Sequence, residues 1–295
     1  MKLALVFEEL IEGTTGMYFR RACSALGLTS DHWRLREAAS IPAGYDLYLR
    51  VDHGDGYTVE LPAHCRPLAF YAIDTHLRHS WQKIQRIAPS CDMVFCCHAD
   101  GARRLRAEWL PVACDPDIHG SPVSEPVWDI GFVGSEGGVP RKFYLQALRE
   151  RYPNHRIGGY VYSEMASIYS RAKIGFNYAI AEDVNMRVFE VLAAGTLLVT
   201  NAINGDDFHR LGLEDRRHLV FYRSPRELFE LIDYYLAHPA DRTRIARIGQ
   251  QLVLERHTYA HRMKQLLTSV SRRLGVPLPE AFTTRETNTC VPTTQ

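Results

Sequence analysis

The sequence predicts an α/β protein with two domains, each built on a parallel β-sheet covered by helices. The chain has 295 residues, and domains of about 100–200 residues make two the expected number. Short apolar runs alternate with helical or loop segments in both halves, which is typical of strands buried on both faces of a parallel sheet. Four prolines, a glycine and two serines mark residues 111–126 as a linker. We therefore expect an N-terminal domain over 1–118, a C-terminal domain over 119–255, a helix over 256–275 that packs back on the N-terminal domain, and a tail over 276–295.

The first half contains four apolar runs that predict strands. They lie at 2–7, 45–51, 67–73 and 93–97. After the first run, apolar residues from Met17 to Leu26 recur at roughly helical spacing, which predicts a β-loop-α opening. Polar residues follow each strand, and in a parallel sheet these segments meet at the carboxyl edge, where ligands bind.

The second half repeats the alternation after the linker. Its predicted strands lie at 128–133, 155–158, 173–178, 196–201 and 219–222, and its predicted helices begin near 141, 164 and 185 and continue to about 273. A glycine-rich loop at 134–138 follows the first of these strands. Asn185 stands at the N-cap position of the third helix, and Gly195 ends that helix.

The charge and the termini exclude several classes of protein. With 35 Lys and Arg against 34 Asp and Glu, the chain has no overall field that would hold it on a polyanion. The apolar run at the N-terminus is shorter than a signal-peptide core of about 7–15 residues, and no run of about 18 apolar residues occurs. Seven cysteines without regular spacing favour reduced thiols. We therefore expect a cytoplasmic protein that does not insert into membranes.

The helix that begins after Asn185 is the most informative candidate site. A helix N-terminus presents unpaired N–H groups and partial positive charge, so the backbone of Asn185, Met186 and Arg187 can bind a phosphate. Glu190 lies further along the same helix. Its carboxylate can accept two hydrogen bonds from a ribose diol, or it can pair with Arg187 one turn earlier. The residues alone leave these two interpretations open.

Several segments around this helix resemble a known family. Glu182 and Glu190 are separated by seven residues and followed by Ala-Ala-Gly and a strand, and this arrangement is similar to the Glu-x7-Glu element of retaining GT-B glycosyltransferases related to family 4. The stretches 130–135, 172–177 and 185–190 look like the CgeB-like, spore-maturation-protein-like branch, and 109–116 resembles its interdomain segment. The resemblance is continuous from about residue 109 to about 267. Before residue 109 it rests only on the order of the predicted strands and helices.

The resemblance implies two Rossmann-like domains facing each other across a cleft, with a nucleotide-sugar donor on the second and the acceptor mainly on the first. Glu190 would bind the donor ribose, and Glu182 would bind hydroxyls of the transferred sugar. The family's Arg after the first Val-Gly is replaced here by Ser135, which follows Gly134. The diphosphate would then be held by Arg141 and Lys142, although both can equally be solvated charges that open a helix.

Other positions carry weaker signals. Gly13 and Gly16 flank a turn that can bring backbone N–H groups to a phosphate or can be a plain turn. Tyr160 can face the nucleotide base or can pack against the sheet edge. Asp74 and His76 can bind the sugar or take the acceptor's proton, or they can be a helix cap and a surface histidine.

We expect no metal site. The acid and histidine cluster at 52–55 has no diagnostic ligand spacing. Cys96 and Cys97 are adjacent on a strand, so their thiols point to opposite faces. The resembled family needs no metal either.

The sequence therefore predicts a glycosyltransferase that moves a sugar from a nucleoside-diphosphate sugar, UDP-sugar first among them, with retention of configuration. The acceptor can be a glycan, a protein, a small molecule or a modified nucleic-acid base, and the near-zero net charge gives the last no support. A nucleotide-sugar epimerase on the same fold and a non-catalytic carbohydrate-binding or structural protein are the alternatives. The oligomeric state stays open.

Overall fold

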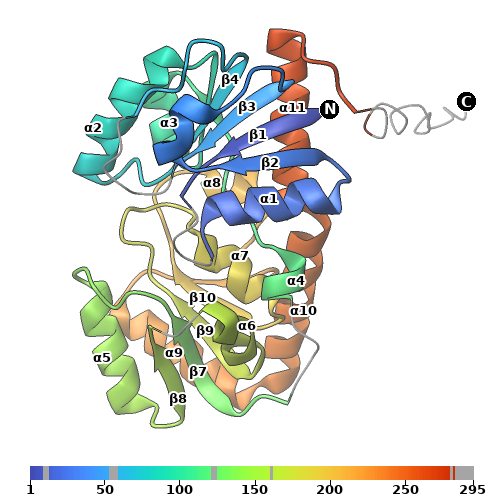
Figure 1. Ribbon diagram of the computed structural model, residues 1–295. Helices are drawn as coiled ribbons and strands as arrows, with labels where there is room; N and C mark the ends of the chain where they lie inside the picture. Colours follow the sequence, from blue (N-terminus) through green and yellow to red (C-terminus); the bar gives the residue numbers. More distant parts are fainter. Residues whose placement is uncertain (9–12, 53–58, 121–124, 160–161, 280–281, 283–295) are drawn as a thin grey trace, which may run out of the picture. The chain divides into compact units, whose positions relative to one another are not determined.

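The computed structural model describes residues 1–8, 13–52, 59–120, 125–159, 162–279 and 282. The chain divides into two compact units. The first unit comprises 1–110 together with 260–295, and the second comprises Pro111–Tyr259. Each unit is an α/β structure on a parallel sheet (Figure 1), which confirms the predicted fold class.

The first unit is built on a six-stranded parallel sheet in the order β2-β1-β3-β4-β5-β6. The strands are β1 (Lys2–Val6), β2 (Thr29–Trp33), β3 (Leu47–Val51), β4 (Leu68–Ala72), β5 (Met93–Cys96) and β6 (Glu108–Trp109). Strands β1, β3, β4 and β5 match the four predicted runs. The sequence prediction missed β2 and β6, because β2 is a polar edge strand and β6 has only two residues.

Helices cover both faces of this sheet. They are α1 (Thr15–Ala25), the 3-10 helices η1 (Leu35–Ser40) and η2 (Ala88–Ser90), α2 (Arg78–Ile87), α3 (Ala99–Leu105) and, from Ala260 onward, α11 (Tyr259–Leu274). Adjacent residues of β4 point to opposite faces. Phe70 packs with Ile84 of α2, whereas the ring of Tyr71 lies 4.9 Å from that of Phe19 in α1. The two helices therefore lie on opposite faces (Figure 1).

The second unit has a five-stranded parallel sheet in the order β11-β10-β9-β7-β8. The strands are β7 (Trp128–Val133), β8 (His155–Gly158), β9 (Ala172–Asn177), β10 (Leu197–Asn201) and β11 (Val220–Tyr222). All five were predicted, and the bounds of β7 and β8 are those predicted. The central strands β7 and β9 pair with Ile130 opposite Ile174 and Gly131 opposite Gly175.

The pleat of these strands decides which helices cover which face. The helices are α4 (Pro116–His119), α5 (Arg141–Arg151), α6 (Tyr162–Ser170), α7 (Met186–Ala193), α8 (Asp207–Arg210), α9 (Pro225–Ala237) and α10 (Pro239–Arg256). Ile130 and Ile174 share a core cluster with side chains of α5 and α9. The opposite face carries glycines, because a Cβ on Gly175 would meet Val191 of α7 and one on Gly131 would approach Tyr169 of α6. These glycines let α6 and α7 approach the strands closely.

No disulfide joins the described cysteines Cys23, Cys65, Cys91, Cys96, Cys97 and Cys114. Burial raises the pKa of Cys96 to about 11, so its thiol stays protonated near neutral pH. None of the helices in the described part of the chain combines the length and the apolar character needed to cross a bilayer.

Candidate functional site

The polar loops of the second unit gather at the carboxyl edge of its sheet. Gly134 and Ser135 follow β7, residues 178–185 connect β9 to α7, and residues 202–206 follow β10. Because β7, β9 and β10 are parallel neighbours, these loops share one edge. The predicted residues Glu182 and Asn185 and the start of α7 therefore lie at the same edge as the glycine-rich loop.

Asn185 takes the extended backbone of an N-cap, with φ −82° and ψ 170°, but its side chain does not cap α7. Its Nδ2 instead donates to Asn177 Oδ1 at 3.3 Å. The buried Oδ1 of Asn185 has no hydrogen-bond partner in the described structure. The first N–H groups of α7, including those of Met186 and Arg187, are therefore not satisfied by this side chain and can bind an anion.

Arg187 is fixed beneath the glycine-rich loop. Its Nε donates to the carbonyl of Val133 at 3.0 Å and its Nη1 donates to Asn177 Oδ1 at 2.9 Å. The guanidinium lies over the ring of Phe132, 4.4 Å from the centroid. Gly134 has φ +137°, and a Cβ at this position would collide with Arg187. Glycine at 134 therefore allows the loop to pass over the guanidinium.

Asn177 was missed by the sequence analysis, although it organises this edge. It is fully buried at the end of β9. Its Oδ1 accepts from Arg187 and Asn185, its Nδ2 donates to Thr200 Oγ1 at 3.0 Å, and its carbonyl accepts from Tyr222. A polar amide directly after the apolar residues 174–176 was the available signal, because a buried amide requires partners.

Arg141 binds backbone oxygens rather than an acid. Its Nε and Nη2 donate to the carbonyl of Tyr178 at 3.2 and 3.1 Å, and its Nη1 donates to that of Ser135 at 3.1 Å. Burial, and after it the charge of Arg187, lowers the pKa of Arg141. Lys142 is exposed. Arg141 and Arg187 therefore place two guanidiniums at this edge, and each donates to carbonyl or amide oxygens.

Glu190 is largely buried, with 12% of its side chain exposed. Burial raises the pKa of Glu190 from 4.5 to about 7, and the charge of Arg187 opposes the rise. In the described structure the two residues form no ion pair, because Arg187 is turned toward Val133 and Asn177. The interpretation of Glu190 as the partner of Arg187 one turn earlier is therefore wrong. Its near neighbour is His119 of α4, whose Nε2 lies 4.0 Å from Glu190 Oε1.

Glu182 lies in the loop after β9 with a left-handed backbone, φ +51°. Its side chain is exposed, and its Oε2 accepts a hydrogen bond from Nδ2 of Asn204, in the loop after β10. Residues with a side chain adopt this conformation at a cost of about 1–3 kcal/mol, and such strain gathers at functional loops. Asn204 was not predicted as a site residue.

The first unit places the remaining candidates at its own carboxyl edge. Asp74 has φ +52°, and α2 begins after Leu77, so the interpretation of Asp74 as the cap of this helix is wrong. His76 is exposed, and its ring lies 5.3 Å from that of His98. The Nδ1 of His98 forms a hydrogen bond with Thr75 Oγ1 at 2.9 Å. The structure thus brings His76 beside a second histidine that the sequence analysis did not use.

Gly13 and Gly16 open α1 in different ways. Gly13 has φ +83°, while Gly16 packs against the ring of Phe7, where a Cβ would not fit. Between them Thr14 is the N-cap, and its buried hydroxyl has no hydrogen-bond partner in the described structure. Of the other candidates, Tyr160 and residues 53–55 lie outside the described residues.

Comparison with known proteins identifies the family. A model of the family described as glycosyl transferase-like matches residues 118–268, slightly more than half of the chain. The chain belongs to this family. The match covers β7 to β11 and the helices between them, the part that carries Glu182 and Glu190. Family membership confirms the predicted class of enzyme, a glycosyltransferase. Among curated protein sequences, none matches the chain significantly.

Solved glycosyltransferases share the fold of this family member at low identity. An alpha-glucosyltransferase in complex with UDP and a 13-mer DNA matches with a TM-score of 0.70 and 12% identity, over 92% of this chain and 100% of that chain. The DNA-modifying enzyme beta-glucosyltransferase matches at 0.59 and 15%, over 93% and 100%. Sucrose-phosphate synthase from Thermosynechococcus elongatus matches at 0.61 and 12%, over 94% and 100%. These likenesses confirm the GT-B fold.

Proposed function

We propose that this chain transfers a sugar from a nucleoside-diphosphate sugar, with UDP as the nucleotide, and retains the anomeric configuration. The observation that carries the proposal is Glu190, a buried carboxylate on the helix whose N-terminus meets the glycine-rich loop. A buried acid is costly unless donors bind it, and a ribose diol offers two. The Glu-x7-Glu spacing and the CgeB-like stretches support retention and a place in that branch.

The diphosphate has a matching environment in the second unit. Arg141 and Arg187 form hydrogen bonds to oxygens without a formal charge, so neither guanidinium is neutralised by a hydrogen-bonded acid. The N–H groups at the start of α7 add partial positive charge at the same edge. We propose that these groups, with the backbone of Gly134 and Ser135 and the side chain of Lys142, bind the donor phosphates.

In the proposed reaction the protein positions the two substrates and stabilises the departing diphosphate, and none of its side chains attacks the sugar as a nucleophile. Glu190 accepts hydrogen bonds from the ribose hydroxyls, and Glu182 accepts them from the transferred sugar. The departing diphosphate is stabilised by the guanidiniums and by the helix N-terminus as its negative charge develops. For the acceptor, we propose that Asp74 and His76 of the first unit bind the sugar or take the proton of the acceptor hydroxyl.

The acceptor is proposed only as a hydroxyl-bearing molecule held by the first unit. Two of the solved structures with this fold are described as DNA-modifying or DNA-bound. The net charge of +1 gives this chain no general attraction for DNA. A cytoplasmic location is proposed from the cysteine content, since the seven cysteines have no regular spacing and no disulfide joins the described ones.

Product analysis with a panel of donors tests this function. The protein is incubated with UDP-glucose, UDP-galactose, UDP-N-acetylglucosamine and GDP-mannose, alone and with glycan, peptide and DNA oligonucleotide acceptors. A glycosyltransferase releases nucleoside diphosphate and forms a new glycoside that retains the donor's anomeric configuration. An epimer formed from donor alone would instead show an epimerase, and tight donor binding without turnover in every combination would show a binding protein.

A further inference from the structure

The linker helix α4 holds a buried histidine in one orientation. His119 is 1% exposed. The ring Nδ1 of His119 accepts the backbone N–H of Asp115 at 2.8 Å, and the backbone N–H of His119 donates to the carbonyl of Asp115 at 2.8 Å. A ring nitrogen that accepts from a backbone amide carries no proton, so in the neutral ring the hydrogen sits on Nε2. The tautomer of His119 is thus determined by α4 itself.

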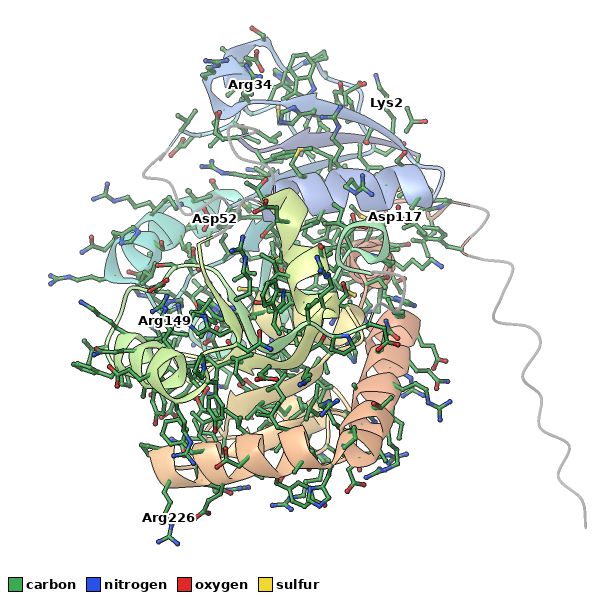
Figure 2. The ribbon with its side chains drawn as sticks, turned by 90° about the horizontal axis from the view of Figure 1, so that it is seen from below. Lys2, Arg34, Asp52, Asp117, Arg149 and Arg226 are labelled. Carbon is green, nitrogen blue, oxygen red and sulfur yellow. The ribbon has the colours of Figure 1, made fainter. Side chains whose placement is uncertain are left out.

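The segment that carries this histidine is anchored at both sides. Asp115 caps α4 by accepting the N–H of Asp117, labelled in Figure 2, at 3.1 Å. One residue earlier, Cys114 donates its N–H to the carbonyl of His257 at 3.0 Å and accepts from the N–H of Tyr259 at 2.9 Å. The histidine ring is therefore held by backbone contacts made before and within the helix, and this explains how a four-residue helix can orient a side chain.

The nitrogen that carries this hydrogen, Nε2, lies near Glu190. The distance of 4.0 Å from Nε2 to Oε1 is longer than a hydrogen bond but short for a dipole and a charge in a buried region, where such interactions are weakly screened. Among the described residues, the other charged or titratable groups that interact electrostatically with Glu190 are Arg187 on its own helix and Tyr169 on α6. Helix α10, which also packs on α7, presents the uncharged Gln250 to Ala193. The neighbouring strands β9 and β10 contribute the uncharged Asn177 and Thr200.

We infer that His119 is a positioning residue for Glu190: its Nε2–H keeps the carboxylate ionised near neutral pH, and the pair thereby sets the pH range in which the chain binds a nucleotide. This inference rests on the proposed role of Glu190 in holding the ribose. The ionised carboxylate accepts hydrogen bonds from a diol more strongly than the neutral acid does, so nucleotide affinity follows its ionisation. Burial already holds the pKa of Glu190 at about 7, where a change in one neighbouring dipole alters the ionised fraction strongly.

Two substitutions separate this role from simple packing. His119→Leu fills similar space without an N–H, whereas His119→Gln carries an N–H at about the position of Nε2. His209→Leu is the matched control, because His209 is an exposed histidine on α8. The first readout needs no nucleotide: the carboxyl carbon of Glu190 is titrated by NMR in the full chain, and its signal is assigned by its loss in Glu190→Gln.

We expect His119→Leu to move the titration midpoint of Glu190 upward by about half a pH unit or more, His119→Gln to restore most of it, and His209→Leu to leave it unchanged. The second readout is the affinity for UDP between pH 6 and pH 9. His119→Leu should bind several-fold more weakly at pH 7 and approach the wild type at pH 9, whereas a packing defect would weaken binding equally at every pH.

An unchanged NMR midpoint in His119→Leu overturns the inference, and so does a pH-independent loss of UDP affinity. If His119→Leu fails to fold, His119→Ala takes its place: a midpoint that rises in His119→Ala and is lowered again in His119→Gln supports the inference, and an unchanged midpoint in His119→Ala overturns it. Failure of the proposed function looks different: the wild type binds no nucleoside diphosphate at any pH, while the NMR titration still measures the effect of His119 on Glu190.

Discussion

Arg187 at the start of α7 donates to the side-chain oxygen of Asn177 at the end of β9, at 2.9 Å. This bond joins the helix that carries Glu190 to the strand that precedes Glu182. The same Asn177 oxygen accepts from Asn185, and the amide nitrogen reaches β10 through Thr200. One buried amide thus connects β9, β10 and the start of α7.

Replacement of Asn177 should therefore be costly. Asn177→Ala leaves Arg187, Asn185 and Thr200 without their partner, and a lost buried hydrogen bond costs about 1–3 kcal/mol. We expect the free energy of unfolding to fall by about 2–4 kcal/mol in urea titrations. Asn154→Ala removes one bond from an exposed amide to the carbonyl of Val127 and should cost less than about 1 kcal/mol. Equal losses in the two variants would contradict the role of Asn177.

Glu190→Gln should stabilise the unliganded protein at high pH. Because the pKa of Glu190 is raised from 4.5 to about 7, the folded state holds this proton more tightly than the unfolded state. This group therefore lowers stability as the pH rises from about 4.5 through about 7, by at most about 3 kcal/mol. We expect Glu190→Gln to exceed the wild type in stability at pH 8, with a smaller difference at pH 5. Urea titrations of both proteins at the two pH values measure this difference. The same stability difference between variant and wild type at pH 5 and pH 8 would refute the prediction.

Arg141→Lys should weaken nucleotide binding more than folding. A lysine keeps the charge but cannot donate to both Tyr178 and Ser135 as the guanidinium does. We expect at least a tenfold loss in UDP affinity by calorimetry. Arg226 projects from α9 and is 89% exposed (Figure 2), so Arg226→Lys should bind UDP as the wild type does. An unaltered affinity in Arg141→Lys would remove this residue from the proposed diphosphate site.

Asn204→Ala should affect the sugar and not the nucleotide. Asn204 bonds the carboxylate of Glu182, and we propose that Glu182 binds the transferred sugar. UDP affinity should remain within about twofold of the wild type, while affinity for the UDP-sugar donor falls severalfold, because loss of one hydrogen bond costs about 0.5–1.5 kcal/mol. Comparing the two ligands by calorimetry separates these effects. An equal loss of affinity for UDP and for the UDP-sugar would contradict this prediction, because it would show that Asn204 affects nucleotide binding as well as sugar binding.

A buried ion pair in the first unit gives a further prediction. Lys83 of α2 and Asp52 after β3, labelled in Figure 2, lie 2.5 Å apart with 3% and 4% of their side chains exposed. Lys83→Met leaves Asp52 buried without this charge partner, which typically costs about 3–5 kcal/mol. The double variant with Asp52→Leu should recover part of this loss in urea titrations. A double variant less stable than Lys83→Met would contradict the pairing.

The fold was predictable from the sequence where strands are central and apolar. The runs 45–51 and 67–73 became β3 and β4, which lie inside the first sheet and are buried along their whole length, because buried strands need apolar residues. Strand β2 was missed because its sequence is polar and its residues are exposed or only partly buried. The start of α7 was predicted at Asn185 from the N-cap preference of asparagine. The backbone of Asn185 has the N-cap conformation, but its side chain forms a hydrogen bond to Asn177 instead of capping the helix.

The site was predictable only in part. The spacing of Glu182 and Glu190 identified two acids, and both lie at or near the carboxyl edge of one sheet. The partners of those acids, His119 and Asn204, come from a linker and from a loop after another strand, and no sequence spacing relates them. The sequence predicted that the backbone N–H of Arg187 binds a phosphate or that its side chain pairs with Glu190. In the structure its side chain instead forms hydrogen bonds to Val133 of β7 and Asn177 of β9. Long-range contacts of this kind depend on the assembled sheet.

Calorimetric titration of UDP at pH 8 tests the central claim most directly, with the wild type beside Glu190→Gln and Glu230→Gln. Glu230 lies on α9 with 61% of its side chain exposed, so it controls for the change in charge. The account predicts that the wild type and Glu230→Gln bind UDP equally and that Glu190→Gln binds at least tenfold more weakly. Binding of UDP to Glu190→Gln with wild-type affinity, or no binding to any of the three proteins, would contradict it.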